Sequence, residues 1–205
     1  LPTVQINGVV WAQAVVGNTV YVGGNFTSAR PAGSPAGTNE VPRSNFLAYD
    51  LTTGALLTSV VLDANAQVRT IEATPDGSRI YVGGDFTTFG GQTRSRIAAV
   101  NTATNTLVGN FTPSVGYHVY DISPTATTVY VAGNFLNVGA QLRERLAAFS
   151  TTGTLLSWAP SVPDREVAAI RVSPDGTKVA IGGKFETVNG TNTFGRGLAM
   201  LDGTS

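Results

Sequence analysis

The sequence predicts an all-β protein built from four repeats, each of about fifty residues and four antiparallel strands. A glycine and phenylalanine motif recurs four times, as YVGGNF at 21–26, YVGGDF at 81–86, YVAGNF at 130–135 and AIGGKF at 180–185. The copies begin 60, 49 and 50 residues apart, and the longer first interval contains an extra segment. The apolar runs between turns are short and rich in Val, Ile, Tyr, Phe and Thr, which favours strands over helices.

The first strand of each motif follows a turn. These turns read VGNT at 16–19, PDGS at 75–78, PTATT at 124–128 and PDGT at 174–177. Their residues favour turn geometry, and the Asp side chains in the two PDG turns are expected to accept hydrogen bonds from backbone N–H groups.

The two glycines of the motif have two interpretations. A phosphate-binding loop needs a helix behind its glycines, and no helix-forming sequence follows residues 81–86. In a strand, a glycine lets a neighbouring sheet approach closely, and we expect the following Phe to fill the gap. We therefore interpret the motif as a structural unit. The position before that Phe holds Asn25, Asp85, Asn134 or Lys184, and such mixed chemistry predicts a solvent-facing side chain.

Three further segments complete each repeat in a fixed order. The second segments are NFLAYD at 45–50, RIAAVN at 96–101, RLAAFS at 145–150 and GLAMLD at 197–202. A turn such as TTG then leads to a third apolar segment, and a fourth segment leads into the next motif.

Four antiparallel strands in a period of forty to fifty residues are typical of β-propeller blades. A solenoid is the alternative, although solenoid repeats are usually shorter. We predict one β-propeller domain over residues 1–205, or a segment of a larger propeller. The predicted blades span approximately 5–62, 63–113, 114–160 and 161–205. An insertion at 29–42 is not required by the repeat, and it is either a binding loop or a flexible excursion.

The segment from Tyr81, YVGGDFTTFGGQTRSRIAAVNTATNTLVGNFTP, resembles the bacterial delta-sixty repeat. The resemblance implies propeller-like blades in large secreted or surface proteins of bacteria, most of which lack an assigned activity. It implies an extracellular or cell-surface location for this chain, with any targeting signal outside residues 1–205. The chain departs from the pattern at Ala132, at Ala180 and at the lone Arg196 of the fourth copy.

The composition restricts the partners and the chemistry. Thirteen Lys and Arg residues balance thirteen Asp and Glu residues, so no strong field attracts nucleic acid or an anionic membrane. The absence of cysteine excludes disulfides, thiolate metal sites and a cysteine nucleophile. No apolar run reaches eighteen residues, so membrane insertion is not expected.

Arginines recur just before the second segment, as Arg43, Arg94 and Arg143. Their guanidinium groups either bind carbonyl or carboxylate oxygens within the fold or form a ring that holds an anion. We favour the structural interpretation.

The best candidate site surrounds the single histidine. Aligned on the downstream turn, His118 corresponds to Arg69, and Asp121 corresponds to Glu72 and Arg171. If this strand is the innermost one, all five side chains lie near the central channel and are candidate ligand-binding residues. With one histidine and no G-x-S-x-G motif, we expect no catalytic residues, no metal and no cofactor.

Two functions remain open at this stage. The first is a non-catalytic extracellular module that binds a glycan or a protein. The alternative is a carbohydrate-active enzyme with a channel site near His118, which a channel plugged by Trp11, Tyr120 and Ile170 would rule out.

The ends of the chain raise the question of ring closure. Residues 2–4 align with the close of a third segment, whereas the chain stops just after the second segment of the fourth repeat. The chain forms a small closed ring of four blades, pairs with a second copy, or belongs to a longer propeller. We favour the longer propeller, and we expect additional blades or a second copy to close the ring.

Overall fold

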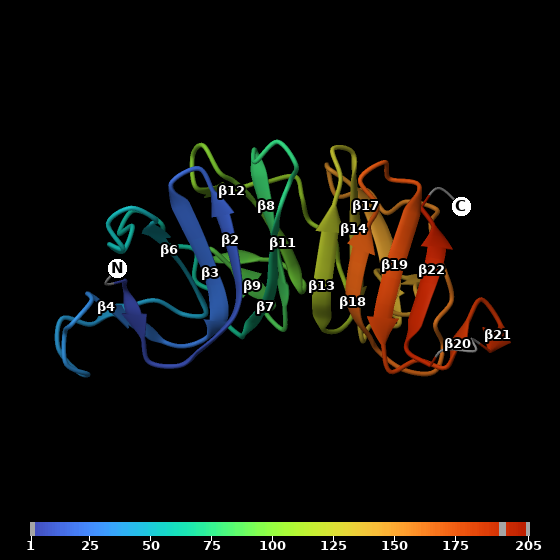
Figure 1. Ribbon diagram of the computed structural model, residues 1–205, viewed down its shortest axis with the longest axis horizontal. Coiled ribbons are helices and arrows are strands. Elements are labelled where there is room, and N and C mark those ends of the chain that lie inside the picture. The colour runs from blue at the N-terminus through green and yellow to red at the C-terminus, as the bar shows by residue number, and fades with distance from the viewer. Residues whose placement is uncertain (1–2, 193–195, 204–205) are drawn as a thin grey trace.

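The computed structural model describes residues 3–192 and 196–203, and these form four main β-sheets and four smaller ones. The main sheets lie in a row (Figure 1). Blue strands of the N-terminal blade and red strands of the C-terminal blade lie at opposite ends of the longest axis. The two end blades therefore lie apart, and the small closed ring of four, one of the three arrangements considered, is wrong. Among the described residues, no helix is long and apolar enough to cross a membrane.

Each predicted repeat forms one sheet, which we call a blade. Blade one contains β2 (Val9–Val16), β3 (Thr19–Asn25) and β6 (Phe46–Asp50). Blade two contains β7 (Val68–Ala73), β8 (Arg79–Gly84), β11 (Ile97–Asn101) and β12 (Thr106–Leu107). Blade three contains β13 (Val119–Pro124), β14 (Thr128–Gly133) and β17 (Leu146–Ser150). Blade four contains β18 (Val167–Val172), β19 (Lys178–Gly183) and β22 (Leu198–Asp202).

The prediction of four strands in every blade is wrong for blades one, three and four as the structure describes them. Only blade two has a fourth strand, β12, and it is two residues long. In blades one and three the third segment makes only the isolated bridges Tyr49–Leu56 and Phe149–Leu155. After these bridges the third segment stops pairing with its sheet, because the residues that come next pack on the following blade. Val60 and Leu62, for example, are buried in the core between blades one and two.

Short hairpins between the second and third strands were not predicted. They comprise β9 (Thr88–Phe89) with β10 (Gln92–Thr93), β15 (Asn137–Val138) with β16 (Gln141–Leu142), and β20 (Thr187–Val188) with β21 (Thr191–Asn192). The insertion at 29–42 occupies the same place in blade one. Its strands β4 (Ser28–Arg30) and β5 (Val41–Pro42) pair with each other, and β4 also pairs with β1 (Gln5–Ile6). The insertion is thus an enlarged hairpin.

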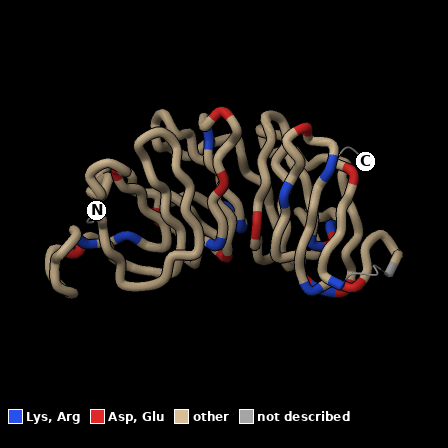
Figure 2. Tube along the Cα trace, viewed as in Figure 1, with Lys and Arg blue, Asp and Glu red and all other residues tan. Residues whose placement is uncertain are grey.

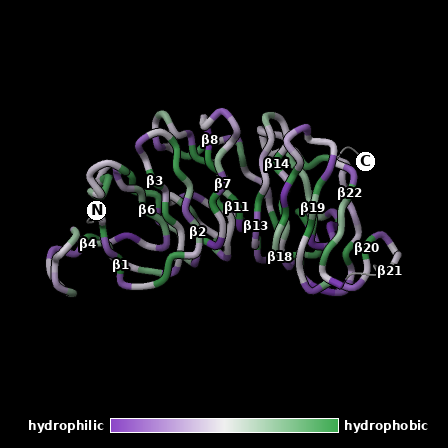
Figure 3. The backbone as a smooth tube through the Cα atoms, in the orientation of Figure 1, coloured by the Kyte–Doolittle hydropathy of each residue, from purple (hydrophilic) through white to green (hydrophobic). Residues whose placement is uncertain are grey.

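The first strand of each blade packs against the first two strands of the preceding blade: β7 on β2 and β3, β13 on β7 and β8, and β18 on β13 and β14. Apolar side chains from the strands fill these joints, while hydrophilic residues concentrate in the loops (Figure 3). The first strands are therefore the line along which neighbouring blades meet. Figure 2 shows that most charged residues lie in blades two to four.

The first glycine of the motif allows this close approach, as predicted. A Cβ built on Gly23 would lie 2.3 Å from Val68 Cγ1, and one on Gly83 would lie 2.5 Å from Val119 Cγ1. The predicted role of the phenylalanine needs correction. Phe86 is fully buried in the joint with blade one, whereas Gly83 faces blade three. The two residues face opposite sides of the sheet and fill different joints.

A second repeat position requires left-handed backbone. Asn45, Arg96, Arg145 and Gly197 all have positive φ, between 65° and 80°. In each blade the carbonyl of this residue accepts a hydrogen bond from the second glycine of the motif. Glycine adopts this conformation without a steric cost, so the replacement of the second arginine in the fourth copy follows from local geometry.

The Asp side chains of the PDG turns accept hydrogen bonds from backbone N–H groups, as predicted. These hydrogen bonds lead to a prediction about the pH dependence of stability. Asp76 accepts hydrogen bonds from Thr74 Oγ1 and from the backbone N–H and hydroxyl of Ser78, and these bonds lower its pKa from 3.8 to about 2. A depressed carboxyl pKa stabilises the fold above pH 3.8, and this contribution is lost as the pH falls toward 2. Urea unfolding across this range is expected to show a steeper loss for the wild type than for Asp76→Ala. Equal losses would contradict the assignment.

Candidate functional site

The first strand of every blade contains one extra residue that bulges out of the ladder. The register with the second strand shifts between Val10 and Ala12, Val68 and Thr70, Val119 and Asp121, and Val167 and Ala169. The bulge residues are Trp11, Arg69, Tyr120 and Ala168. A bulge redirects a side chain and is frequent at binding sites. Because these strands meet one another, the four side chains share one surface, which we call the axial surface.

The alignment predicted for His118 and Asp121 is wrong by two residues. Five residues, 74–78, connect β7 to β8, but only three, 125–127, connect β13 to β14. An alignment that counts back from the turn therefore shifts the residues of the third blade by two positions relative to their counterparts. By strand pairing, Tyr120 corresponds to Arg69, and Asp121 corresponds to Thr70. Glu72 and Arg171 do correspond, as predicted, because their turns have equal length.

Asp85 is the centre of the first polar group on the axial surface. Its carboxylate accepts two hydrogen bonds from Arg69, with Nε–Oδ1 and Nη2–Oδ2 distances of 2.8 Å, and one from Gln67 Nε2 at 2.6 Å. Nδ1 of His118 also contacts Asp85 Oδ1, without the alignment of a linear hydrogen bond. Burial raises the pKa of Asp85, but the bonds from Arg69 and Gln67 and the nearby charges outweigh it, so the pKa lies below its usual value.

Aromatic rings surround this group. The guanidinium carbon of Arg69 lies 5.1 Å from the centroid of the Tyr120 ring, within the range of a cation–π contact. The His118 ring stacks on Tyr120 at 6.1 Å and contacts the exposed Tyr117 at 3.8 Å between centroids. Arginine, imidazole and phenol groups thus form one continuous polar and aromatic surface.

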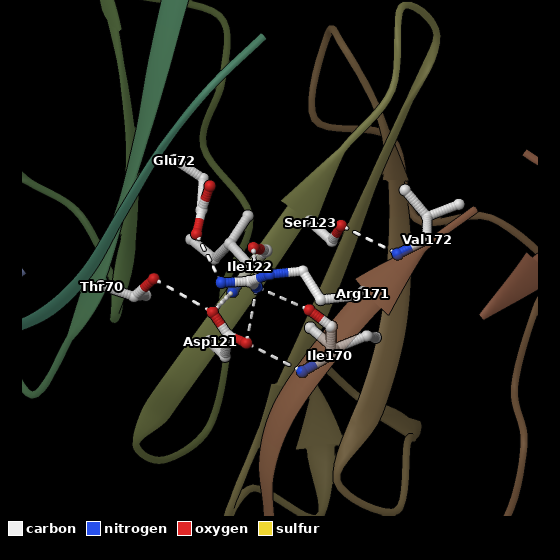
Figure 4. Close-up of polar contacts among 8 residues, drawn as sticks. All are labelled: Thr70, Glu72, Asp121, Ile122, Ser123, Ile170, Arg171 and Val172. Atoms are coloured by element: carbon white, nitrogen blue, oxygen red, sulfur yellow. Dashed lines mark hydrogen bonds and ion pairs between the residues drawn. The ribbon is translucent and has the colours of Figure 1, made fainter. Parts of the chain in front are cut away.

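Asp121 is the centre of the second polar group, which joins blades two, three and four (Figure 4). It accepts hydrogen bonds from the backbone N–H of Ile122 at 2.9 Å and of Ile170 at 2.8 Å, and from Thr70 Oγ1 at 3.3 Å. Arg171 Nη1 lies 2.8 Å from Asp121 Oδ2.

The same guanidinium reaches blade two. Arg171 Nη2 lies 2.8 Å from Glu72 Oε1. Burial raises the pKa of Glu72, and the charge of Arg171 opposes this effect. A single arginine therefore connects carboxylates from two other blades.

The five predicted residues accordingly fall into two groups. His118 and Arg69 surround Asp85, whereas Asp121, Glu72 and Arg171 form a separate set. Sequence reasoning missed Asp85 because its position in the motif was interpreted as solvent-facing, and its side chain is in fact only 12% exposed. Lys184, at the same position, fits that interpretation at 72% exposure and pairs with Glu166.

The arrangement is better suited to binding than to proton transfer. Arg69 and Arg171 occupy the Asp85 and Asp121 carboxylates, so neither oxygen pair is free to act on a substrate proton. Over the described part of the chain, no group of three or more His, Cys, Asp or Glu residues could hold a metal ion.

The recurring arginines have the structural role that we favoured. Arg43 donates to the carbonyls of Pro42 and Thr58, and Arg94 donates to the carbonyl of Thr93. Arg143 binds the carbonyls of Leu142 and Leu156. Arg43 and Arg94 are buried, so these two guanidinium groups stabilise loops and do not present a ring of charge to solvent.

An open groove of about 890 Å³ lies beside the second polar group. Turn residues of blades two to four line it, together with Glu72, Ser123, Tyr130 and Trp158. Its largest side chains are already engaged, since Tyr130 Oη donates to the carbonyl of Gly203 and Trp158 Nε1 donates to the carbonyl of Asp202.

Comparison with known proteins supports the fold. The pattern of the family described as "Domain of unknown function (DUF5122) beta-propeller" matches residues 74–102. No curated protein sequence matches the chain. The computationally designed Ika4 protein is a structural neighbour with a TM-score of 0.59 and 15% identity, over 97% of this chain and 93% of that one.

Two further solved structures are similar to this chain at a comparable TM-score. The WD40 repeats of RRP9 align with a TM-score of 0.60 and 12% identity over 91% of this chain and 51% of that one. A chain of a mitotic checkpoint complex aligns at 0.51 and 17% over 85% of this chain and 46% of its own length. The chain thus spans about half the length of these two neighbours. These likenesses, together with the repeated sheets, show that the chain has a β-propeller type of fold.

Proposed function

We propose that this chain is a non-catalytic, extracellular β-propeller module that binds a glycan or another protein through its axial surface. The observation that supports this most is the group of aromatic and arginine side chains on the axial surface. Trp11 is 57% exposed, Tyr117 beside His118 is 47% exposed, and Arg69 with Tyr120 lies on the same surface. Aromatic rings combine an apolar face with polar edges and are enriched where proteins contact ligands.

Both classes of ligand suit this surface. The flat apolar faces of sugar rings stack on exposed aromatic side chains, and hydroxyl groups pair with Arg or His donors. A protein partner would use the same aromatic and arginine side chains as anchors. The neighbour from a mitotic checkpoint complex agrees with a role in protein assembly.

The proposed location rests on the resemblance to delta-sixty repeats of bacterial secreted and surface proteins. The short family match over residues 74–102 agrees with that resemblance. The balanced charge continues to argue against nucleic acid as the partner. Closure of the ring, by further blades or by a second copy, belongs to the same proposal.

The carbohydrate-active enzyme has less support. Glycoside hydrolysis normally needs one protonated carboxyl group and one free carboxylate across the scissile bond. Asp85 is held as a carboxylate by Arg69 and contacts His118. The predicted channel plug does not decide the matter, because Ile170 is buried in the joint between blades three and four while Trp11 is exposed.

A glycan array followed by calorimetry on the retained glycan tests the proposal. We expect Trp11→Ala and Tyr117→Ala each to weaken binding about tenfold, the loss of roughly one aromatic contact. Leu51→Ala serves as a control, because Leu51 is also exposed, at 45%, but lies in a turn after β6.

Two results would overturn the proposal. One is equal binding by all three variants, which would place the ligand elsewhere. The other is hydrolysis of the retained glycan by the wild type but not by His118→Ala, which would show an enzyme.

A further inference from the structure

The C-terminal face of blade four carries apolar side chains that no described residue covers. Leu198 is 68% exposed and Met200 is 69% exposed. Their counterparts in the other blades are completely buried by the blade that follows: Phe46, Ile97 and Leu146 at the first position, Ala48, Ala99 and Ala148 at the second. Blade four therefore presents the surface of an interior joint without its partner.

Gly182 on β19 also lies at an uncovered position. It occupies the position of Gly23 and Gly83, where an added Cβ would meet the valine of the next first strand within 2.5 Å. At Gly182 the nearest atom to an added Cβ is Ala169 Cβ, at 3.7 Å. No described residue of the chain fills the space that this glycine leaves for an approaching strand.

The N-terminal face of blade one is only partly covered. Its outer part is covered, because Val20, Val22 and Leu47 are buried beneath Val4 and Ile6. Its first strand is not covered, and Val10 and Val15 are 36% and 55% exposed.

One of the uncovered residues of β2, Val10, has buried counterparts in other blades. By strand pairing, Val10 corresponds to Val68 and Val119, the residues that approach Gly23 and Gly83. Both of these valines are fully buried. Val10 is therefore exposed at a position that an interior joint buries.

We infer that a second copy of this chain covers these faces, with β2 of one copy packed against β18 and β19 of the other, as β7 packs against β2 and β3. Val10 would then lie over Gly182 as Val68 lies over Gly23. The two end faces of the described row supply both halves of the joint, so two copies arranged head to tail form two identical joints. Propellers usually have four to eight blades, and two copies of the four described blades reach eight, whereas three copies exceed that range. A second copy is one of the two partners proposed above to close the ring, the other being further blades. The joint between copies does not depend on the ligand of the axial surface.

Sedimentation and light scattering of the chain measure the number of copies. At about 100 μM we expect a particle of twice the 21.2 kDa of one chain. The double variant Leu198→Asp/Met200→Asp is expected to be a monomer with an unchanged far-ultraviolet circular dichroism spectrum, because both side chains are exposed in the single chain. Leu142→Asp is the matched control: Leu142 is 66% exposed on the β15–β16 hairpin, and the variant should remain a dimer.

Cysteine cross-linking tests the orientation, and the chain has no cysteine of its own. At the Gly23–Val68 joint, the built Cβ of Gly23 lies 2.9 Å from Val68 Cβ, so a small shift brings such a pair into the disulfide range of about 3.5–4.5 Å. We expect an oxidised mixture of Val10→Cys and Gly182→Cys chains to form a covalent dimer, and neither variant alone to do so.

Each of four results would overturn the inference. These are a monomeric wild type at this concentration, particles larger than two chains, a dimer that survives the double Asp variant, and cross-linking of Gly182→Cys with itself. None of them bears on glycan binding, so failure here and failure of the proposed function are separable.

Discussion

Replacement of Gly84 by alanine is expected to destabilise the protein by about 3 kcal/mol. A Cβ at this position would lie 2.3 Å from the carbonyl oxygen of Gln67 and 3.0 Å from Val68 Cα. Both atoms are backbone atoms at the start of β7, so relief requires a shift of the backbone and cannot come from a side-chain rotation. Overpacking of this kind costs about 1–3 kcal/mol and occasionally more. Denaturant unfolding monitored by circular dichroism measures the change.

Two other glycines provide the comparison. Gly109→Ala is expected to have little effect, because nothing lies within 4 Å of the added Cβ. Gly83→Ala is expected to cost about 1 kcal/mol, since its clash is with side chains and the same position in blade three is the buried Ala132. If Gly83→Ala proved more harmful than Gly84→Ala, the second glycine would not be the more constrained residue of the pair.

Removal of the Asp121 carboxylate is expected to destabilise the fold by about 3 kcal/mol. Asp121→Ala leaves the buried N–H of Ile170 without its acceptor and takes one carboxylate from Arg171. A buried donor without a partner costs about 1–3 kcal/mol, and loss of one member of a buried ion pair about 3–5 kcal/mol. Because the Arg171 side chain is 60% exposed, we expect the loss of unfolding free energy to lie at the lower end of this range. Thermal and urea unfolding should agree on this change.

Asp202→Ala is the matched control. Asp202 also forms an ion pair, with Lys178, but its side chain is 59% exposed. Exposed pairs contribute little, so this variant should change the free energy of unfolding by less than about 0.5 kcal/mol. Similar losses in both variants would contradict the claim that Asp121 holds blades two, three and four together.

The candidate site was only partly predictable. Glu72 and Arg171 were correctly aligned because turns of equal length precede their motifs. In the structure, Arg171 Nη2 lies 2.8 Å from Glu72 Oε1. His118 was misaligned because its turn is two residues shorter. Asp85 was not selected, since nothing in the local sequence distinguishes a carboxylate that faces solvent from one that faces Arg69 of the adjacent strand.

The sequence by itself determined the period, the first three strands of each blade and the turns before the repeated motif. Alternation of side chains, glycine and proline in turns, and the recurrence of a motif are local properties, and each repeat displays them within its own fifty residues. The tertiary structure alone decided the register of the bulges, the joining of blades two to four by Asp121, and the two uncovered end faces. These features depend on how separate sheets pack, because a bulge is defined only against its partner strand and a face is uncovered only when no other chain segment reaches it.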